Sequence, residues 1–249
     1  MKNLILFFLL SFSLFSQKNI IDDNNLKQGY WELFFPRTDS VISEKGFFID
    51  NKEHGVWTRF HDSGIVREIV NYKHGLIEGV RVFLDKKGKL IEQENYSSNQ
   101  LHELQRYFHD TGKLKMEVNY EYGVLEGVFM KYYRNGKKQE SSIYKDGMKH
   151  GKSFWFFENG TVSIEYPYEN GQINGIAKTF YNDGTLKSES TYVNNELNGE
   201  KKEYFSSKKI KTKGFYKNGK KEGKWYSYDE NGKILEITKY KNGEKKWKE

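Results

Sequence analysis

The sequence predicts an all-β protein, an elongated array of about eight 24-residue antiparallel β-hairpin repeats that form one twisted sheet. Composition is the first indication, because 16% of the residues are aromatic and 23 are glycine, whereas only 2 are proline. Aromatic rings suit a half-buried pleated surface, and glycine supplies the positive φ of tight turns. The other indications are a 24-residue internal repeat and the Asn-Gly, Asp-Gly and Lys-Gly pairs that separate strand-length segments.

The repeat keeps its register through eight units, and we number the positions of each unit from Gly55, which is position 0 of the first. Positions 0 and 9 are glycine except at Glu103 and Lys208. Position 17 is always tyrosine: Tyr72, Tyr96, Tyr120, Tyr144, Tyr168, Tyr192, Tyr216 and Tyr240. Position 20 is always glycine or asparagine: Gly75, Asn99, Gly123, Gly147, Gly171, Asn195, Gly219 and Gly243. Because both residue types adopt left-handed backbone readily, position 20 is predicted to lie in a hairpin turn.

The alternation of side chains along a strand predicts which residues share a face. Positions 5, 11 and 17 have the same parity within their strands, so the ring, aliphatic and tyrosine columns are predicted to line one face. Aromatic residues at positions 2 and 4 would then lie on the opposite face among polar residues: Trp57, Phe83, Tyr107, Phe129, Trp155 and Trp225. We interpret these six as candidate partner-binding residues for a protein or a glycan. The alternative is that twist, or pairing with another copy, buries them as ordinary structure.

The N-terminus has the pattern of a secretory signal peptide, because Met1-Lys2-Asn3 precedes an apolar run from Leu4 to Phe15. This run of about 12 residues is shorter than the roughly 20 that span a bilayer. The predicted organisation is a signal peptide at 1–16, a cap with an incomplete first repeat at 17–54, eight repeats at 55–246 and a tail at 247–249. The predicted location is periplasmic, outer-membrane-associated or extracellular.

Several local motifs suggest chemistry but fall in the repeat register. Asp62-Ser63-Gly64 and Asp110-Thr111-Gly112 resemble aspartic-protease loops, yet both occupy positions that are hairpin turns in every unit. His61 and His109 lie two repeats apart, about 19 Å, which is too far for one metal ion. The chain has no cysteine, so thiolate catalysis and cysteine-ligated metals are excluded. The sequence therefore predicts no catalytic residues, no metal ligands and no cofactor.

Positive charge is concentrated at the C-terminal end, because residues 199–249 hold 16 lysines against 8 acidic residues. The candidates for binding an anionic surface are Lys201, Lys202, Lys208, Lys209, Lys211, Lys213, Lys220, Lys221 and Lys224. Anionic lipid, lipopolysaccharide or an acidic protein would suit such a patch, and nucleic acid is not expected for an exported chain. Alternatively, the lysines protect the last strand from pairing with other chains.

Segments such as Tyr216-Lys-Asn-Gly219-Lys-Lys-Glu-Gly223-Lys-Trp225-Tyr-Ser-Tyr228 resemble MORN repeats. The resemblance is closest to the bacterial variant of YwqK-type antitoxins and exported repeat proteins, and it covers residues 29–246. It implies stacked β-hairpins that act as scaffolds or as protein- or lipid-binding surfaces.

Together these observations predict an exported, non-enzymatic repeat protein that binds a protein partner through an aromatic-rich sheet surface. The alternative function is a membrane-surface or envelope-structural protein that binds anionic lipid or lipopolysaccharide through its basic C-terminal repeats. Oligomeric state is not predicted. Pro167, at position 16 of a central unit, is unexpected in a paired strand and suggests a β-bulge.

Overall fold

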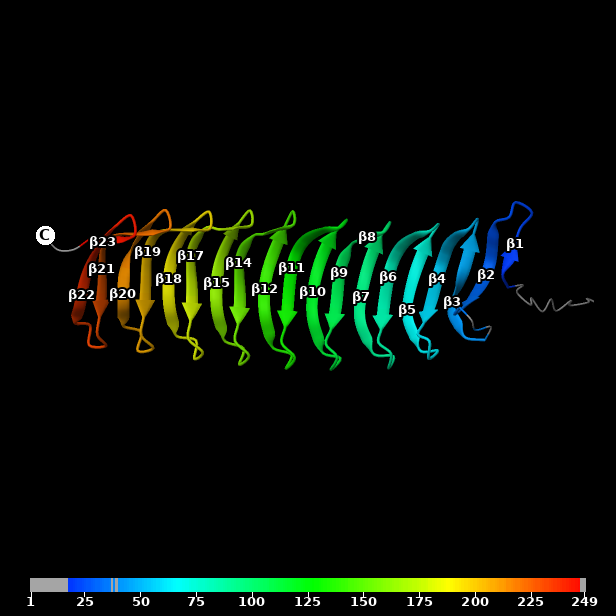
Figure 1. The fold of residues 1–249 in the computed structure, drawn as a ribbon, viewed down its shortest axis with the longest axis horizontal. Coiled ribbons are helices and arrows are strands. Elements are labelled where there is room, and N and C mark those ends of the chain that lie inside the picture. The colour runs from blue at the N-terminus through cyan, green and yellow to red at the C-terminus, as the bar shows by residue number, and fades with distance from the viewer. Residues whose placement is uncertain (1–17, 37, 39, 247–249) are drawn as a thin grey trace, which may run out of the picture.

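The fold is one elongated antiparallel sheet whose strands follow one another along the long axis (Figure 1). The structure is a computed structural model that describes residues 18–36, 38 and 40–246. All regular elements in these residues are strands, 23 in total. The predicted all-β hairpin array is therefore confirmed. The predicted signal peptide and tail, residues 1–16 and 247–249, lie outside the described residues.

Each repeat contributes one hairpin, and hairpins pair edge to edge with their neighbours in sequence. The leading unit contains β1 (Ile20–Ile21), β2 (Lys27–Phe34) and β3 (Ile42–Ile49). The first four hairpins are β4 (Lys52–Phe60) with β5 (Val66–Lys73), β6 (Leu76–Leu84) with β7 (Leu90–Ser97), β9 (Glu103–Phe108) with β10 (Leu114–Glu121), and β11 (Val124–Tyr132) with β12 (Lys138–Lys145). The last four are β14 (Gly151–Phe156) with β15 (Val162–Glu169), β17 (Gly175–Phe180) with β18 (Leu186–Val193), β19 (Glu196–Tyr204) with β20 (Ile210–Lys217), and β21 (Lys220–Tyr228) with β22 (Ile234–Lys241). Short strands complete the sheet: β8 (Gln100–Leu101), β13 (Met148–Lys149), β16 (Gln172–Ile173) and β23 (Glu244–Lys246).

The turn between successive units has the backbone that the sequence predicts. Asn218 and Gly219, at positions 19 and 20, have φ values of 47° and 72°. Two consecutive positive φ values define the type I′ turn, whose twist matches that of the flanking strands. Asn195, which stands where most units have glycine, has φ of 70°. The glycine and asparagine column therefore follows from the turn geometry.

A one-residue bulge within each hairpin overturns the predicted face assignment. In the first unit Arg59 pairs with Glu68, but the next residue, Phe60, pairs with Val66, so that Arg67 is the extra residue. One inserted residue moves all following side chains to the other face of the strand. Positions 5 and 11 therefore lie on one face, whereas the tyrosine of position 17 lies on the other, together with positions 2 and 4. The prediction that positions 5, 11 and 17 share a face is wrong.

Pro167 lies opposite a second bulge, where one unit meets the next. Pairing of β15 passes from Glu165–Lys178 directly to Tyr168–Ile173. The equivalent residue Asn95 shows where the backbone at this position points, because its N–H donates to the side chain of Gln105 in β9. No backbone acceptor of the next strand is used there, so a proline loses no ladder bond. The carbonyl of Pro167 still accepts from Asn174 at 3.0 Å, and the suggested bulge is confirmed.

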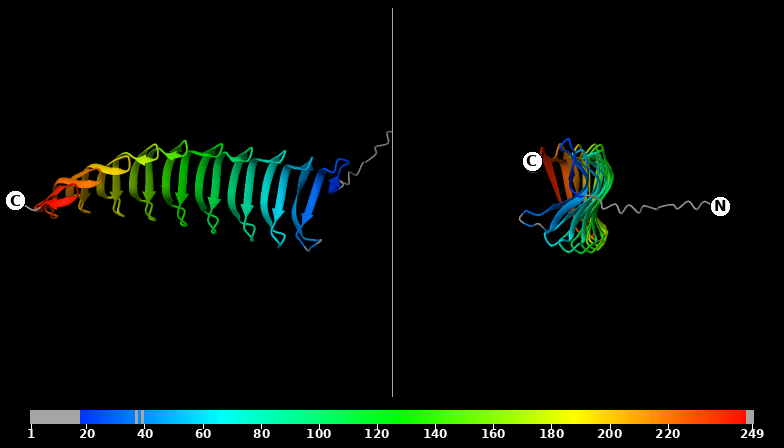
Figure 2. Two further views of the ribbon diagram at one scale, coloured as in Figure 1. Left: turned by 45° about the horizontal axis from the view of Figure 1, so that its top comes forward. Right: turned by 90° about the vertical axis from the view of Figure 1, so that its right-hand side faces the viewer.

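The sheet is bowed along its strands and twisted along its length (Figure 2). Its best-packed region is the N-terminal end, where Trp31, Phe48, Trp57 and Val70 form a cluster. The edge of β2 is closed by β1 and by Asn19, whose side chain exchanges hydrogen bonds with the backbone of Glu32 at 2.9 and 3.2 Å. Among the described residues, no helix is long and apolar enough to cross a membrane.

Candidate functional site

Side chains at positions 2, 4, 13, 15 and 17 form one face of the sheet, which we call the inner face. Most of the buried residues lie on it at positions 2, 13 and 15: Trp57, Glu68, Val70, Glu94, Gln105, Val118, Ser142, Ser153, Ala177, Ser190, Trp225 and Thr238. A single-layer sheet buries side chains only where they crowd one another, and bowed strands crowd the side chains on their concave side. Because burial is concentrated on the inner face, we assign this face to the concave side of the sheet, whose bowing is visible in Figure 2.

All six candidate aromatic residues lie on this inner face, beside the tyrosine column rather than opposite it. Trp57 and Trp225 are only 1% and 9% exposed, which favours the alternative that these two are buried as ordinary structure. The other four rings are partly exposed: Phe83, Tyr107, Phe129 and Trp155. Among these six, the accessible rings therefore lie in four consecutive repeats, between buried tryptophans near both ends.

Two glycines explain why Trp57 and Trp225 can be buried in a single layer. Gly46 lies across the strand from Trp57, and a Cβ on Gly46 would be 2.3 Å from the indole ring. A Cβ on Gly214 would be 2.2 Å from the ring of Trp225 in the same way. Sequence reasoning missed this pair of relationships. The signal was present, because neither glycine falls in a turn column of the repeat.

A network of charged side chains runs across the N-terminal part of the inner face. Glu68, 3% exposed, accepts from Arg59 at 3.1 Å and from Arg81 at 2.6 Å. Arg59 also donates to Glu44 at 2.8 Å and to the Tyr72 hydroxyl at 3.2 Å. Burial lowers the pKa of Arg59, but the hydrogen bonds to Glu44 and Tyr72 and the charge of Glu68 outweigh this and raise the pKa above its ordinary value. These groups hold each other in fixed positions.

In the next units, carboxylates and tyrosine hydroxyls replace the arginines. Glu94 accepts from Tyr96 at 2.8 Å and from Tyr107 at 3.3 Å. Burial, together with the charge of Glu94, raises the pKa of Tyr107. Burial and the neighbouring Glu94 also raise the pKa of Glu92. This stretch of the inner face thus presents hydrogen-bonding groups of acidic character beside an accessible ring.

Lysines stack on the rings at three places along the same face. Lys149 Nζ lies 4.6 Å from the ring centroid of Trp155 and donates to Glu140 at 2.7 Å. Lys221 Nζ lies 4.2 Å from the ring of Trp225, and Lys27 Nζ lies 4.9 Å from that of Trp31. A cation over an aromatic face is attracted by the ring quadrupole. The arrangement recurs because all three lysines stand two residues before the glycine that begins a unit.

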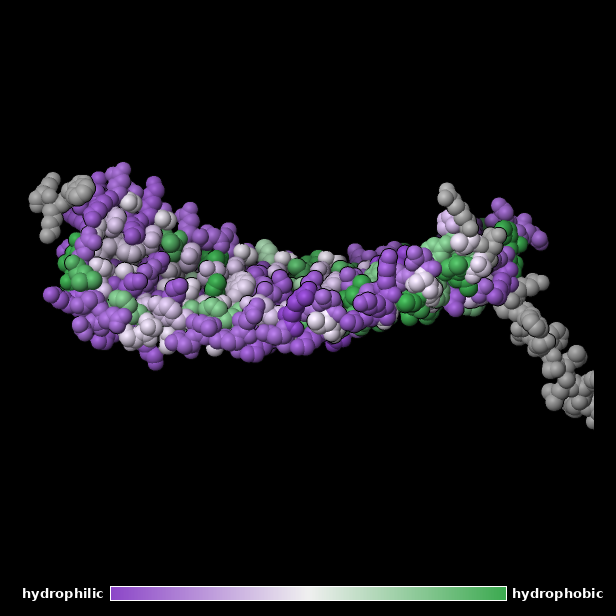
Figure 3. All heavy atoms as spheres, turned by 60° about the horizontal axis from the view of Figure 1, so that its bottom comes forward, coloured by the Kyte–Doolittle hydropathy of each residue, from purple (hydrophilic) through white to green (hydrophobic). Residues whose placement is uncertain are grey.

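The opposite, outer face carries positions 1, 3, 14 and 16 and is more solvated. Its exposed aliphatic side chains recur at position 1: Val56, Val80, Val128 and Ile176. β-Branched residues are enriched in strands generally, so their recurrence at position 1 does not by itself indicate a binding surface. In the view of Figure 3, hydrophobic residues form small patches separated by hydrophilic ones.

The candidate lysines do not gather on one face. Lys201 and Lys202 pair with Glu203 and Glu200 at 3.0 and 2.6 Å. Lys213 lies over Tyr226 on the outer face, whereas Lys221 lies over Trp225 on the inner face. The exposed members are Lys208, Lys209, Lys211, Lys220 and Lys224.

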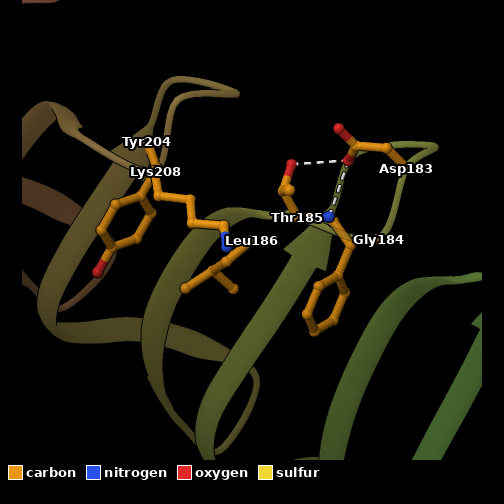
Figure 4. A pocket seen from close by; sticks show the side chains of 7 residues that line it. Asp183, Gly184, Thr185, Leu186, Tyr204 and Lys208 are labelled. Atoms are coloured by element: carbon orange, nitrogen blue, oxygen red, sulfur yellow. Dashed lines mark hydrogen bonds between the residues drawn. The ribbon is translucent and has the colours of Figure 1, made fainter.

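An open depression of about 560 Å³ lies between two neighbouring turns (Figure 4). Phe180, Leu186 and Tyr204 contribute the apolar side chains of its wall. In several earlier units the side chain at position 10 lies against the position-9 glycine of the next unit. Lys137, for example, lies 3.5 Å from where a Cβ on Gly160 would be. Here position 10 is the shorter Thr185, and its hydroxyl and N–H bond instead to Asp183 at 2.7 and 2.8 Å.

The histidines singled out in the sequence have structural contacts. His61 Nε2 lies 3.1 Å from the carbonyl oxygen of Leu84, and His109 Nε2 lies 3.1 Å from that of Tyr132. Tyr133 and Tyr181 make the same link between neighbouring units through their hydroxyl groups. In the part of the chain that the structure describes, no group of three or more possible ligands is placed to hold a metal ion.

Comparison with protein families agrees with this geometry. The family model for a MORN repeat variant matches seven segments that together make up more than half of the chain: residues 53–74, 104–122, 125–146, 149–170, 173–194, 197–218 and 221–242. Hairpins of the same kind also form outside the matched segments, in β2–β3 and across β6–β7. No curated protein matches the sequence.

Proposed function

The chain belongs to the MORN repeat variant family, and from this premise we propose that it is an exported, non-enzymatic scaffold that binds a protein partner along the inner face of its central repeats. The observation that carries the proposal is the distribution of accessible rings at positions 2 and 4, beside the tyrosine column. Phe83, Tyr107, Phe129 and Trp155 are partly exposed in four consecutive units, whereas Trp57 and Trp225 beyond them are buried.

The central rings are suited to binding because their surroundings are already ordered. Arg81 lies 4.3 Å over the ring of Phe83 while its Nε donates to Glu68. Tyr107 is held by Glu94, and Trp155 by Lys149. Rings whose rotamers are fixed before binding lose little conformational entropy when a partner arrives. Aromatic residues are also the commonest energetic anchors of protein interfaces.

The charges beside the rings favour an extended partner that carries both positively and negatively charged side chains. Glu92 and Glu94 lie beside Tyr107, and Lys149 lies beside Trp155, two units further along the array. A chain lying along the long axis would therefore meet acidic and then basic groups. Export is supported by Met1-Lys2-Asn3 and the apolar run that follows, and it implies a partner in the periplasm, at the outer membrane or outside the cell.

Affinity capture from the cell-envelope fraction tests the proposal, with residues 17–249 as bait. The test variant is Phe129→Ala combined with Trp155→Ala. The matched control is Val128→Ala combined with Phe154→Ala, because these adjacent residues point to the outer face. We expect one defined protein that survives a high-salt wash, is retained by the control and is lost with the inner-face variant. Equal retention by both variants would refute binding at the inner face.

The exposed lysines at the C-terminal end support a second candidate, binding of anionic lipid or lipopolysaccharide. Lys208, Lys209 and Lys211 lie close together in sequence and are exposed. In the same capture experiment this function predicts lipid that is released by salt, because screening weakens exposed charges. Replacing these three lysines by glutamine should abolish it and leave capture of a protein partner unchanged.

A further inference from the structure

The tyrosine column forms a regular ladder along the inner face. Its members in the central units are half-buried: Tyr96, Tyr120, Tyr144, Tyr168 and Tyr192. Each unit adds two strands to the sheet, so successive tyrosines recur about every 9.6 Å along the long axis. Because the bowed strands run across that axis, the concave side forms a trough in the same direction (Figure 2). A chain lying in this trough would meet an equivalent tyrosine at every step.

Other aromatic rings pack against the ladder and make it continuous. The ring centroids of Phe129 and Tyr144 are 5.8 Å apart. In the following unit, Tyr166 lies 5.6 Å from Trp155 and 6.4 Å from Tyr168. All five side chains are half-buried, so each ring is held by its neighbours and still presents part of its surface to the trough.

The hydroxyl groups of the ladder differ along its length. Tyr72 accepts from Arg59 at 3.2 Å, and Tyr96 donates to Glu94 at 2.8 Å. The hydroxyls of the next four members form no hydrogen bond with another described residue and are not buried: Tyr120, Tyr144, Tyr168 and Tyr192. These four units therefore offer a row of donors to the trough, which suits an occupant with free carbonyl acceptors.

The spacing of the ladder decides which chain conformation fits. A polyproline II helix has three residues per turn, so it presents every third side chain on one side at intervals of about 9.3 Å. Over three intervals this differs from the ladder by about 1 Å. An α-helix repeats after seven residues, about 10.5 Å, and would be out of register by about 3 Å. A β-strand returns to the same face after only about 6.6 Å. Polyproline II is also the conformation whose carbonyls remain free.

Negative charge lies beside the N-terminal end of this stretch. Glu92 lies across the strand from Tyr107, and Glu94 accepts from the hydroxyl of the same tyrosine. Neither carboxylate forms an ion pair with another described residue. Burial and the charge of Glu94 raise the pKa of Glu92, although Arg81 and Lys115 oppose this rise. The local negative charge is thus incompletely balanced, and a basic residue of an occupant would complement it.

We propose that the tyrosine ladder binds a proline-rich segment of the partner protein in polyproline II conformation, with a proline at every third residue against successive tyrosines and a basic residue beside Glu92 and Glu94. The proposal rests on the function proposed above, because it names the kind of segment that the partner presents to the inner face. Aromatic-lined grooves recognise such segments because the helix is formed before binding and little entropy is lost.

The test measures binding of fluorescent peptides to residues 17–249. The regular peptide is Arg-Arg followed by four Pro-Ala-Ser triplets, and its reverse, with the arginines last, covers the opposite chain direction. The displaced peptide has the same composition, but every second proline is exchanged with the alanine that follows it, which breaks the three-residue period. In the protein, Tyr144→Phe with Tyr168→Phe removes two free hydroxyls and keeps the rings. The matched control is Tyr226→Phe with Tyr228→Phe, because these tyrosines lie on the outer face.

We expect the regular peptide to bind in one of its two directions and the displaced peptide to bind at least about tenfold more weakly. The inner-face tyrosine variant should weaken binding, whereas the outer-face control should not, with circular dichroism showing an intact sheet in both. Glu92→Gln should also weaken binding of the arginine-containing peptide. The proposal is overturned if the regular and displaced peptides bind equally, if neither direction binds, or if the inner-face variant binds as the unaltered chain does.

Failure of this proposal can be distinguished from failure of the proposed function. If the regular peptide does not bind but capture of a protein still depends on Phe129 and Trp155, the inner face binds a partner of another kind and only the polyproline II proposal falls. If capture does not depend on these two rings either, the proposed function falls as well. Displacement of the captured protein by the regular peptide, and not by the displaced one, would support both.

Discussion

The indole ring of Trp225 occupies the space that a side chain on Gly214 would need. A Cβ there would be 2.2 Å from the ring, and the same relationship holds for Trp57 and Gly46. At the equivalent positions Tyr166 and Ala177, directly after the paired residues Glu165 and Lys178, the sizes are reversed, with the large ring on the earlier strand. Position 15 of one unit and position 2 of the next thus form a cross-strand pair whose combined volume is limited.

Gly214→Ala is therefore expected to destabilise the C-terminal repeats by about 1–3 kcal/mol, the usual cost of overpacking. Urea unfolding followed by tryptophan fluorescence measures the change. Adding Trp225→Ala to Gly214→Ala should cost less than Trp225→Ala alone, because the new methyl group then has room. Strict additivity of the two substitutions would contradict the proposed size limit.

Removing the Glu68 carboxylate is expected to destabilise the protein more than Gly214→Ala does. This carboxylate is buried between Arg59 and Arg81, so Glu68→Ala leaves two partly buried guanidinium groups without their shared partner. Removing one member of a buried ionic network typically costs about 3–5 kcal/mol. The exposed pair of Glu244 and Lys246 is the matched control, and Glu244→Ala should change stability by less than about 1 kcal/mol. Similar effects of both substitutions on the urea midpoint would rule out this role for Glu68.

The raised pKa values of several tyrosines predict how stability changes at alkaline pH. Burial, with the hydrogen bond to Glu189, raises the pKa of Tyr204 to about 12, and burial raises the pKa of Tyr144, Tyr166 and Tyr168. The unfolded chain releases these protons near pH 10 and the folded chain at higher pH. Stability is therefore complete below about pH 10 and falls as pH rises toward 12.

Absorbance of ionised tyrosine at alkaline pH measures this directly, with the urea-unfolded chain as reference. Ionisation of the folded chain should lag behind that of the unfolded chain. Glu189→Gln should bring the Tyr204 transition to lower pH, because it removes a carboxylate that opposes ionisation. Coincident titration curves for the folded and unfolded chain would contradict the prediction.

Replacing either of two residues that have left-handed backbone, one at the start of β9 and one in a turn, is expected to increase stability. Glu103 and Lys208 stand where other units have glycine, and their φ values are 63° and 66°. Left-handed backbone costs a residue with a Cβ about 1 kcal/mol, so Glu103→Gly and Lys208→Gly should each stabilise by up to that amount. Lys209→Gly is the control, since Lys209 follows this turn without a positive φ and should lose stability. A thermal midpoint that falls in Lys208→Gly would refute the assignment.

The repeat, the hairpins and the turns could be predicted because their backbone demands specific residue types. Only glycine and asparagine suit position 20 in this chain, and the column shows it. The backbone at the bulge requires no specific residue type, because position 12 is Arg67 in one unit, Gln139 in another and Leu235 in the last. Without a sequence mark for the bulge, simple alternation assigned the tyrosines to the wrong face.

Burial of individual rings was equally hard to predict, for a different reason. Trp57 and Trp155 are the same residue type two positions apart in the unit, yet one is buried and the other is partly exposed. The difference comes from the residue on the preceding strand, which is Gly46 for Trp57 and Glu140 for Trp155. Cross-strand partners depend on the register, which the bulges shift by one residue.

Site-specific photo-crosslinking tests the central claim, that a partner lies on the inner face, most directly. A photoreactive phenylalanine analogue at Phe83 or Phe129 reports on the inner face, and the same analogue at Val80 or Val128 reports on the outer face of the same strands. Illumination in the cell envelope should attach one protein at Phe83 and Phe129 and none at the two valines. Crosslinks at the valines alone would contradict the account and move the binding surface to the outer face.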